Sequence, residues 1–343
     1  SGRHFFVPPQ GDTASRPSDC EPGSLRFNTD SAKLEYFRGN TIGWTEIEAS
    51  SHEVGGGTGS NYGTGTRGFN AGRHVYETNI EFITISTLGD SQDFGDLTVG
   101  RYSMGNLVGS DSRMLFGGGY GYKNTIDFWT VQSTGNAVDF GDLTDLRQMM
   151  SGCNDKIRGI WAGGRGPGHT GVDTMDYVTI QSTGNAVDFG NLSASKTTPA
   201  SCSSSTRGIW NYDAGPVAEM KFLNFRSTGN TTDFGDGHGG AQMFGGQSSS
   251  TRGMWAGNYA SSNIISYITM ATEGDTTDFG DLTQGRYNFT GMSSPTRSVF
   301  SAGTYYDSGF IRPNTMDYVE IATTGNAKDF GDMAMMTNVT GLA

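Results

Sequence analysis

The sequence predicts an all-β fold, namely a six-bladed β-propeller with four-stranded blades. A tetrapeptide, Asp-Phe-Gly-Asp or a one-residue variant, recurs every 45 to 51 residues, beginning at Asp93, Asp139, Asp188, Asp233, Asp278 and Asp329. An arginine followed by a short apolar run recurs with a similar period, at Arg67, Arg113, Arg158, Arg207, Arg252 and Arg297. Six copies of two such marks are typical of blade-like repeats, each of which contributes one small sheet. Glycine makes up 53 of the 343 residues, which disfavours helices.

Each repeat is expected to hold four short strands. In one copy they are predicted at Arg101–Gly109, Arg113–Gly118, Thr125–Gln132 and Ala137–Leu143. In the next copy Val178 and Ile180 alternate with polar neighbours, so one face of that strand is expected to be buried. Ser-Thr-Gly-Asn stretches should form the hairpin turns before the fourth strands, because Gly and Asn tolerate positive φ; they end at Asn136, Asn185 and Asn230.

The ends of the repeat region suggest a closed ring. The copy that begins at Arg67 lacks a clear first strand, and the tail after the last Asp-Phe-Gly-Asp contains one strand-like stretch, Met335–Thr340. We favour pairing of this tail inside the first blade, which would remove exposed sheet edges. The alternative is that Glu53–Thr64 supplies the missing strand.

The repeats resemble kelch-type propellers in their architecture. Kelch units carry a double glycine after the second strand, as Gly117-Gly118 and Gly163-Gly164 do here. Other copies depart from this pattern, at Asn211-Tyr212, Gly257-Asn258 and Ala302-Gly303. The resemblance therefore implies a propeller without pointing to one kelch family.

The segment before the repeats is predicted to be organised differently. Residues 1–20 are expected to form an extended arm, 21–50 a small β-module, 51–65 a Gly-rich linker, and 66–343 the propeller. Within the module, Leu25 and Phe27 alternate on one expected strand, and Leu34 and Tyr36 on the next. The arm has too little apolar content to fold alone, and we expect it to order on a partner surface.

The module also carries a resemblance to known proteins. Its pattern Gly-Ser-Leu-Arg-Phe-Asn-Thr-Asp, Leu-Glu-Tyr-Phe, Trp and Glu-Ile resembles a short β-module of tailed-phage fibre and appendage proteins. The repeat, with Thr-Arg-Gly-Ile-Trp-Ala-Gly-Gly and Ser-Thr-Gly-Asn-Ala-Val-Asp-Phe-Gly-Asp-Leu, resembles repeats in structural proteins of marine phages, cyanophages above all. The resemblance implies a virion protein and defines neither a ligand nor a catalytic residue.

From this we expect a structural protein on the virion surface, made in the host cytoplasm. Residues 1–50 should bind other virion proteins, and the propeller should serve host adsorption by contacting a surface glycan, with several copies on each particle. The expected attachment residues are Leu25, Phe27, Leu34, Tyr36, Trp44 and Ile47. One alternative is a capsid decoration or head-fibre protein without a receptor. Another is a secreted lectin or a propeller enzyme that acts on glycans.

Composition narrows the possible partners. The net charge of −12 disfavours binding to nucleic acid and to anionic membranes. No apolar run is long enough to span a bilayer, and the N-terminus lacks the apolar region of a signal peptide, so membrane insertion is not expected. Three cysteines make no disulfide framework; Cys153 and Cys202 hold equivalent positions in neighbouring repeats and should both be reduced.

The repeated charged and aromatic residues are predicted to be structural. The two Asp residues of each mark lie three apart and face opposite sides of a strand, which is poor geometry for a metal or an acid–base pair. We interpret them as turn and ladder residues that could pair with the repeated Arg. That Arg is expected to cross-link neighbouring blades, with an anion-binding channel as the alternative. The equivalent aromatics should be core residues: Phe116, Trp161, Trp210, Trp255 and Phe300.

No catalytic chemistry is predicted. No two of the five His residues have metal-ligand spacing, and neither a Cys-x-x-Cys nor a Gly-x-Ser-x-Gly motif occurs. Gly-rich stretches such as Gly117–Gly119 lack the Lys and helix of a phosphate loop. We therefore expect neither an enzyme nor a bound metal or cofactor.

The candidate ligand contacts are on the loops between the second and third strands. These loops vary most in length, and in a propeller they share one face. Aromatics on such loops indicate a contact surface, and random drift of unconstrained loops is the alternative. The candidate residues are His74, Tyr76, Tyr120, Tyr122, Arg165, His169, Tyr212, Tyr259, Tyr305, Tyr306, Phe310 and Arg312.

Overall fold

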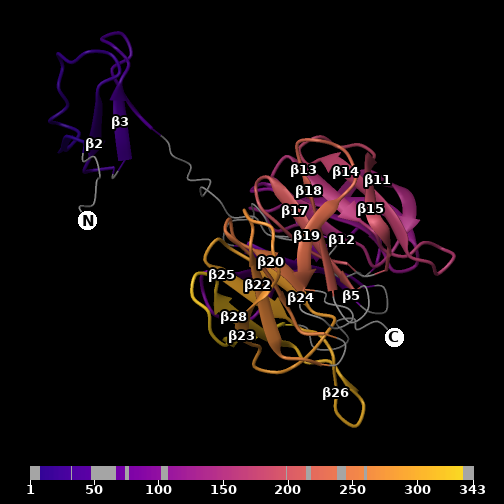
Figure 1. Ribbon diagram of the computed structural model, residues 1–343. Helices are drawn as coiled ribbons and strands as arrows, with labels where there is room; N and C mark the ends of the chain where they lie inside the picture. Colours follow the sequence, from indigo (N-terminus) through magenta and orange to yellow (C-terminus); the bar gives the residue numbers. More distant parts are fainter. Residues whose placement is uncertain are drawn as a thin grey trace. The chain divides into compact units, whose positions relative to one another are not determined.

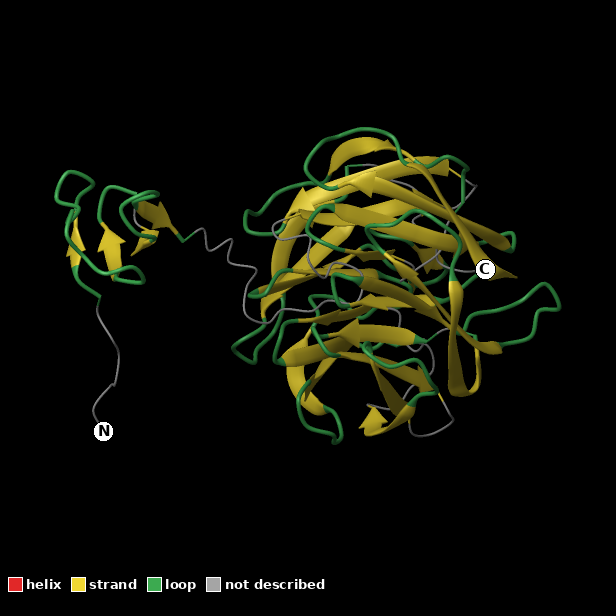
Figure 2. Cartoon of the chain, turned by 90° about the horizontal axis from the view of Figure 1, so that it is seen from above, coloured by secondary structure: helices red, strands yellow, loops and turns green. Residues whose placement is uncertain are grey.

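A computed structural model describes residues 8–31, 33–47, 67–73, 77–101, 107–197, 199–213, 218–237, 245–258 and 261–334. Within these ranges every regular element is a β-strand, as Figures 1 and 2 show, so the all-β prediction is confirmed. In the described part of the chain no helix could cross a membrane. The chain divides into two compact units, Ser1–His52 and Glu53–Ala343.

The first unit is one small sheet. Its strands are β1 (Gln10–Gly11), β2 (Leu25–Asn28), β3 (Lys33–Phe37) and β4 (Trp44–Glu46), in that order. β1 runs parallel to β2, and the other neighbours are antiparallel. The arm expected over residues 1–20 is therefore not extended from residue 8 onward. Because β1 pairs with β2, residues 8–20 belong to the module rather than preceding it.

The second unit consists of consecutive antiparallel sheets. In the described residues the first sheet has three strands, β5 (Arg67–Arg73), β6 (Glu77–Thr84) and β7 (Gln92–Asp96). The second comprises β8 (Leu107–Gly109), β9 (Arg113–Gly119), β10 (Lys123–Thr130) and β11 (Val138–Arg147). The third comprises β12 (Ser151–Asn154), β13 (Arg158–Ala162), β14 (Val172–Thr179) and β15 (Val187–Lys196).

The remaining sheets follow the same plan. The fourth comprises β16 (Ala200–Ser203), β17 (Arg207–Asp213), β18 (Ala218–Asn224) and β19 (Thr232–Gly237). The fifth comprises β20 (Gly245–Ser248), β21 (Arg252–Ala256), β22 (Ile264–Thr269) and β23 (Thr277–Asp281). The sixth comprises β24 (Thr290–Ser293), β25 (Arg297–Ser301), β28 (Thr315–Glu320) and β29 (Lys328–Asp332). A separate hairpin, β26 (Tyr305–Tyr306) and β27 (Phe310–Ile311), lies in the chain between β25 and β28.

The predicted strands are largely confirmed, with bounds that differ by a few residues. In the second sheet the first strand is shorter than predicted, Leu107–Gly109 in place of Arg101–Gly109, and the fourth is longer, ending at Arg147. The first sheet has no fourth strand among the described residues, and both segments expected to supply one, Met335–Thr340 and Glu53–Thr64, lie outside them. Many small sheets of this kind make the fold propeller-like.

The Asp-Phe-Gly-Asp mark joins each sheet to the next. The N–H of Gly135, in a turn of the second sheet, donates to the Phe94 carbonyl of the first sheet at 2.8 Å. The same bond recurs around the repeats and also joins the first sheet to the last, from Gly89 N–H to the Phe330 carbonyl at 2.9 Å. The intermediate pairs are Gly184–Phe140, Gly229–Phe189, Gly274–Phe234 and Gly325–Phe279.

Close backbone approach explains why the third residue of the mark is glycine. Gly95 has a φ of +153°, and a Cβ added there would lie 2.3 Å from the Gly135 carbonyl oxygen. The turn residue after Gly135 supports the same contact, because Asn136 Oδ1 accepts the Asp96 N–H at 3.1 Å. The Asn of the turn thus acts as a hydrogen-bond acceptor, which the sequence interpretation based on positive φ did not anticipate.

The repeated arginines cross-link neighbouring sheets, as predicted. Arg113 donates to the Gln181 carbonyl of the next sheet at 3.0 Å, and Arg297 of the last sheet donates to the Ile85 carbonyl of the first at 3.0 Å. Each guanidinium also lies over an aromatic ring of its own sheet, as Arg113 lies over Phe128 at 4.7 Å. Their hydrogen bonds across sheets go to carbonyl oxygens, and Arg207 also forms an ion pair with Glu273 at 3.9 Å, so the pairing considered with the Asp residues of the mark is not what links the sheets.

Apolar side chains fill the spaces between sheets. Phe69 and Phe94 of the first sheet pack with Trp129 of the second, and Ile83 and Ile85 of the first pack in a cluster with residues of the sixth. The equivalent aromatics predicted to be core are all buried, namely Phe116, Trp161, Trp210, Trp255 and Phe300. Cys153 and Cys202 are buried free thiols, and burial raises the pKa of both well above the usual value.

Three buried ion pairs lie where the chain passes from one sheet to the next. Arg101 contacts Asp127 at 3.2 Å, Arg286 contacts Asp317 at 2.8 Å, and Arg147 pairs with Asp176 in the same way. Each arginine ends the motif Asp-Leu-Thr-x-x-Arg, whose Thr hydroxyl donates to the same carboxylate, as Thr98 does to Asp127 at 2.6 Å. Burial lowers the pKa of Arg101 and Arg286, and the adjacent carboxylate opposes that shift.

The Arg147–Asp176 pair provides a stability test. Asp176→Asn should lower the free energy of unfolding by about 3 to 5 kcal/mol, because Arg147 would remain buried without its counter-ion. Urea denaturation of the whole chain measures the change. Asp188→Asn, on the exposed side of β15, is the matched control and should change little. Equal effects of the two substitutions would contradict the role given to the pair.

Candidate functional site

The predicted ligand-contact residues fall into two described groups. Tyr120, Tyr122, Arg165 and His169 belong to loops of the second and third sheets, whereas Tyr305, Tyr306, Phe310 and Arg312 belong to the sixth. Tyr212 lies in β17, paired with Glu219 across the ladder. The other candidates lie outside the described residues: His74, Tyr76 and Tyr259.

The first group is built where three loops meet. Tyr122 Oη and His169 Nδ1 share a hydrogen bond of 2.7 Å, and their rings are in an edge-to-face arrangement at 5.6 Å. Gln148 ties the loops together: its side-chain oxygen accepts the Gly121 N–H at 3.1 Å, and its backbone exchanges two hydrogen bonds with Arg165. Tyr122 and His169 both have positive φ, 55° and 58°, which is uncommon for residues other than glycine. Adjacent sheets therefore present one ordered aromatic pair.

The second group is centred on the β26–β27 hairpin, which stands out from the rest of its unit in Figure 1. Tyr305 pairs with Ile311 and Tyr306 with Phe310. Tyr306 and Phe310 are 66% and 62% exposed, and their rings make an edge-to-face contact at 5.6 Å. Tyr305 and Arg312, at the base, are partly buried. The hairpin thus offers two aromatic rings to solvent in a fixed arrangement.

The module places its predicted attachment residues mainly on one sheet face. Leu25, Leu34 and Ile47 are 46%, 41% and 36% exposed. Strand pairing places Leu25 opposite Tyr36 and Phe27 opposite Leu34, and side chains alternate along each strand, so these residues share that face. Phe27 and Tyr36 are partly buried. We call Leu25, Phe27, Leu34, Tyr36 and Ile47 the apolar face.

Trp44 lies apart from the apolar face. It pairs with Phe37, which is buried, and their rings are 5.5 Å apart. Its indole N–H donates to the Pro17 carbonyl at 2.9 Å, and the guanidinium of Arg26 lies 5.7 Å from its ring. Trp44 therefore helps to hold residues near Pro17 against the sheet.

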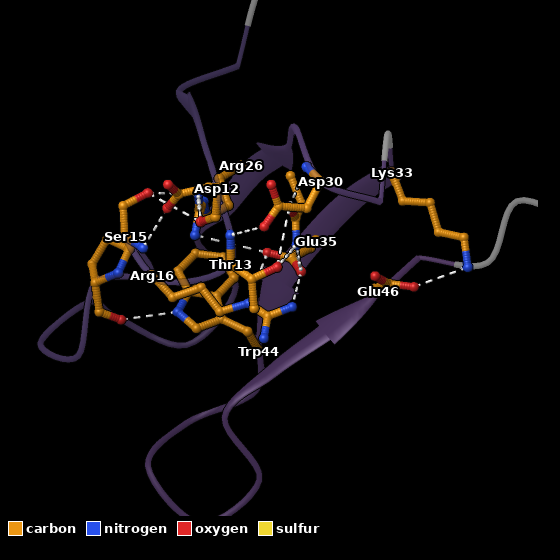
Figure 3. A network of polar contacts seen from close by, with 12 residues as sticks. Asp12, Thr13, Ser15, Arg16, Arg26, Asp30, Lys33, Glu35, Trp44 and Glu46 are labelled. Carbon is orange, nitrogen blue, oxygen red and sulfur yellow. Dashed lines mark hydrogen bonds and ion pairs between the residues drawn. The ribbon is translucent and has the colours of Figure 1, made fainter.

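The opposite face of the sheet, which also carries the buried Phe37, holds a network of polar contacts (Figure 3). Glu35 is fully buried and accepts hydrogen bonds from Arg16 Nε at 3.2 Å and from Asn28 Nδ2 at 2.8 Å. Arg26, also buried, donates to the Asp12 carbonyl at 2.8 Å. Because Asp12 and Arg16 precede the predicted module, their contribution could not be found within 21–50. The module thus buries Glu35 and Arg26 together with Phe37 and leaves aliphatic side chains exposed, whereas most small sheets expose their charged residues.

The hydrogen bond from Arg16 is the largest influence that lowers the pKa of Glu35 below its ordinary value of 4.5. The bond from Asn28 and the charges of Arg16 and Arg26 act in the same direction, whereas burial opposes them. A carboxyl group whose pKa is lower in the folded state stabilises that state above its unfolded pKa. This contribution is lost as the pH falls from about 4.5 through the folded pKa.

Acidification should therefore weaken the module in a way that depends on Glu35. Hydrogen exchange at the β2–β4 amides of the whole chain, corrected for its intrinsic pH dependence, should show protection falling below about pH 4.5. Glu35→Gln should lower the protection at pH 7 by about 2 kcal/mol and flatten this pH dependence. Glu21→Gln, at an exposed position, is the control. A Glu35→Gln profile that runs parallel to the wild-type profile would contradict this role.

Among the described residues, no three His, Cys, Asp or Glu side chains are grouped as metal ligands. The chemistry that the two loop groups and the apolar face can supply is contact through aromatic rings, aliphatic surface and a few hydrogen-bonding groups. All three are therefore candidate binding surfaces.

Comparisons with known proteins bear on the fold and not on the function. No family model matches the chain, and no curated protein matches it. A solved structure titled "Structure of YjhT" is similar, with a TM-score of 0.56 and 6% sequence identity. The similarity covers 70% of this chain and 86% of that one. At this identity, the likeness concerns the fold alone.

Proposed function

We propose that the chain is a structural protein of a phage virion, anchored by its first unit and displaying its second unit for adsorption to the host surface. The observation that carries the proposal is the apolar face of the module. The phage-like sequence pattern of the module supports the same assignment, as does the division of the chain into two compact units. The proposal assigns attachment to the first unit and contact with the host to the second.

The composition of the apolar face favours a protein partner. Leu25, Leu34 and Ile47 are aliphatic and exposed, and the buried charges of Glu35 and Arg26 belong to the opposite side of the sheet. Exposed apolar surface is unfavourable in water by about 25 cal/mol per Å², so covering this face would stabilise a complex. An uncharged face offers nothing to a phosphate backbone or an anionic headgroup. An apolar surface on another virion protein matches it best.

We also propose that the six sheets are the blades of a closed six-bladed propeller. Three kinds of contact between the sixth and first sheets support closure: Gly89 N–H to the Phe330 carbonyl, Asp332 N–H to Asp90 Oδ1, and Arg297 to the Ile85 carbonyl. All three repeat the contacts found between consecutive sheets. A ring of this kind would give the displayed unit a rigid frame.

Attachment can be tested with particles that lack the chain. The whole chain should be retained on such particles, and Leu25→Ser combined with Leu34→Ser should reduce retention at least 10-fold, because both changes make the apolar face polar. Leu146→Ser alters an exposed leucine of the second unit and should leave retention unchanged. Normal retention of the double variant, with loss for the control, would reverse the assignment of anchor and displayed unit.

The same particles separate adsorption from capsid decoration. Particles that carry the chain should adsorb to host cells faster than particles without it. Equal adsorption, with retention intact, would favour the decoration role.

A further inference from the structure

We infer that the β26–β27 hairpin is a contact site for neutral carbohydrate, with Tyr306 and Phe310 as the stacking residues; this inference rests on the proposed function and specifies its ligand. The hairpin is an addition to the common repeat. β25 and β28 of the sixth sheet are separated by the 13 residues 302–314, whereas β21 and β22 of the fifth sheet are separated by the seven residues 257–263. The extra residues form their own two-stranded ladder.

The hairpin adds nothing to the cores between the sheets. Tyr306, Phe310 and Ile311 are all exposed, and none of them belongs to a buried cluster. Elsewhere in this unit the exposed large apolar residues are spread over other elements, whereas here three lie within one short hairpin. Exposed aromatics gathered in this way are typical of contact sites.

The ring pair is held in place before any ligand arrives. Tyr306 and Phe310 are opposite each other in the ladder, and Asp307 N–H donates to the Gly309 carbonyl at 2.9 Å to close the turn. Ser308, at the tip of the hairpin, has a positive φ of 54°. An arrangement already fixed in the free protein reduces the entropy lost on binding.

The chemistry of the hairpin favours a sugar ring over a lipid or an anionic ligand. The electron-rich faces of Tyr306 and Phe310 can receive the C–H groups of a pyranose. The Tyr306 hydroxyl and the Asp307 carboxylate can hydrogen-bond sugar hydroxyls. The exposed carboxylate of Asp307, next to Tyr306 in the hairpin turn, together with the net charge of −12, opposes approach to an anionic bilayer or an acidic sugar. These features together point to a neutral polysaccharide.

An array of defined neutral and acidic oligosaccharides tests the site with the whole chain. Wild type should bind at least one neutral oligosaccharide, and Tyr306→Ala and Phe310→Ala should each weaken that binding at least 10-fold. Tyr306→Phe keeps the ring and should retain most of the affinity. Val187→Ala removes a different exposed apolar side chain and should have no effect. Unchanged melting of each variant shows that folding is intact, since all of these side chains are exposed.

Vesicles of phosphatidylethanolamine and phosphatidylglycerol form the second arm of the experiment. Three results would overturn the inference. The wild type could bind no neutral oligosaccharide, Tyr306→Ala could bind the oligosaccharide as well as the wild type does, or Tyr306→Ala could lose binding to vesicles alone. Retention on particles is measured separately, through the apolar face. The hairpin assignment can therefore fail while the anchoring role stands, and the reverse is equally observable.

Discussion

The second unit depends on one repeated contact, the backbone bonding between the Asp-Phe-Gly-Asp mark and the turn of the next sheet. The Phe of the mark is buried in the core between sheets. The Gly of the mark, having no side chain, lets the turn of the next sheet come close, as Gly95 does for the turn at Gly135. The last residue of the mark contributes its backbone N–H. This explains why Asn191 can replace Asp in the third copy: its N–H still donates to Asn230 Oδ1 at 3.0 Å. The contact between sheets thus depends on the backbone and the packing of the mark, while its carboxylates make further bonds in single copies, as Asp96 Oδ1 does by accepting from the Thr78 hydroxyl at 2.7 Å.

A frame fixed in this way leaves its connecting loops free to differ. The arginine cross-links and the buried Arg–Asp pairs lie within or between sheets, and none of them requires a particular length for the loop after β13 or β25. That freedom allows Tyr122 and His169 to meet across two sheets and lets the sixth sheet carry an additional hairpin. In the proposed display role, contact with the host would evolve in these loops while the sheets remain constant.

The repeats allowed most local features of the second unit to be predicted, whereas pairings between segments far apart in the chain were missed. The period and alternation predicted the strands, the buried aromatics and the cross-linking by residues such as Arg113. The Arg147–Asp176 pair was missed although Asp-Leu-Thr-x-x-Arg could have signalled it, because the partners lie in different sheets. Alternation in the module defined two faces of the sheet without saying which is buried. Contacts from Arg16, assigned to an arm, decide that the charged face is covered.

Hydroxyl-radical footprinting of the whole chain, free and bound to particles, tests most directly the claim that the first unit anchors and the second is displayed. The method reads the solvent accessibility of Leu, Ile, Tyr and Phe side chains individually. The account predicts that binding protects Leu25, Leu34 and Ile47, while Tyr306 and Phe310 stay as reactive as in the free chain. Protection of Tyr306 and Phe310 with no change at Leu25, Leu34 and Ile47 would contradict it.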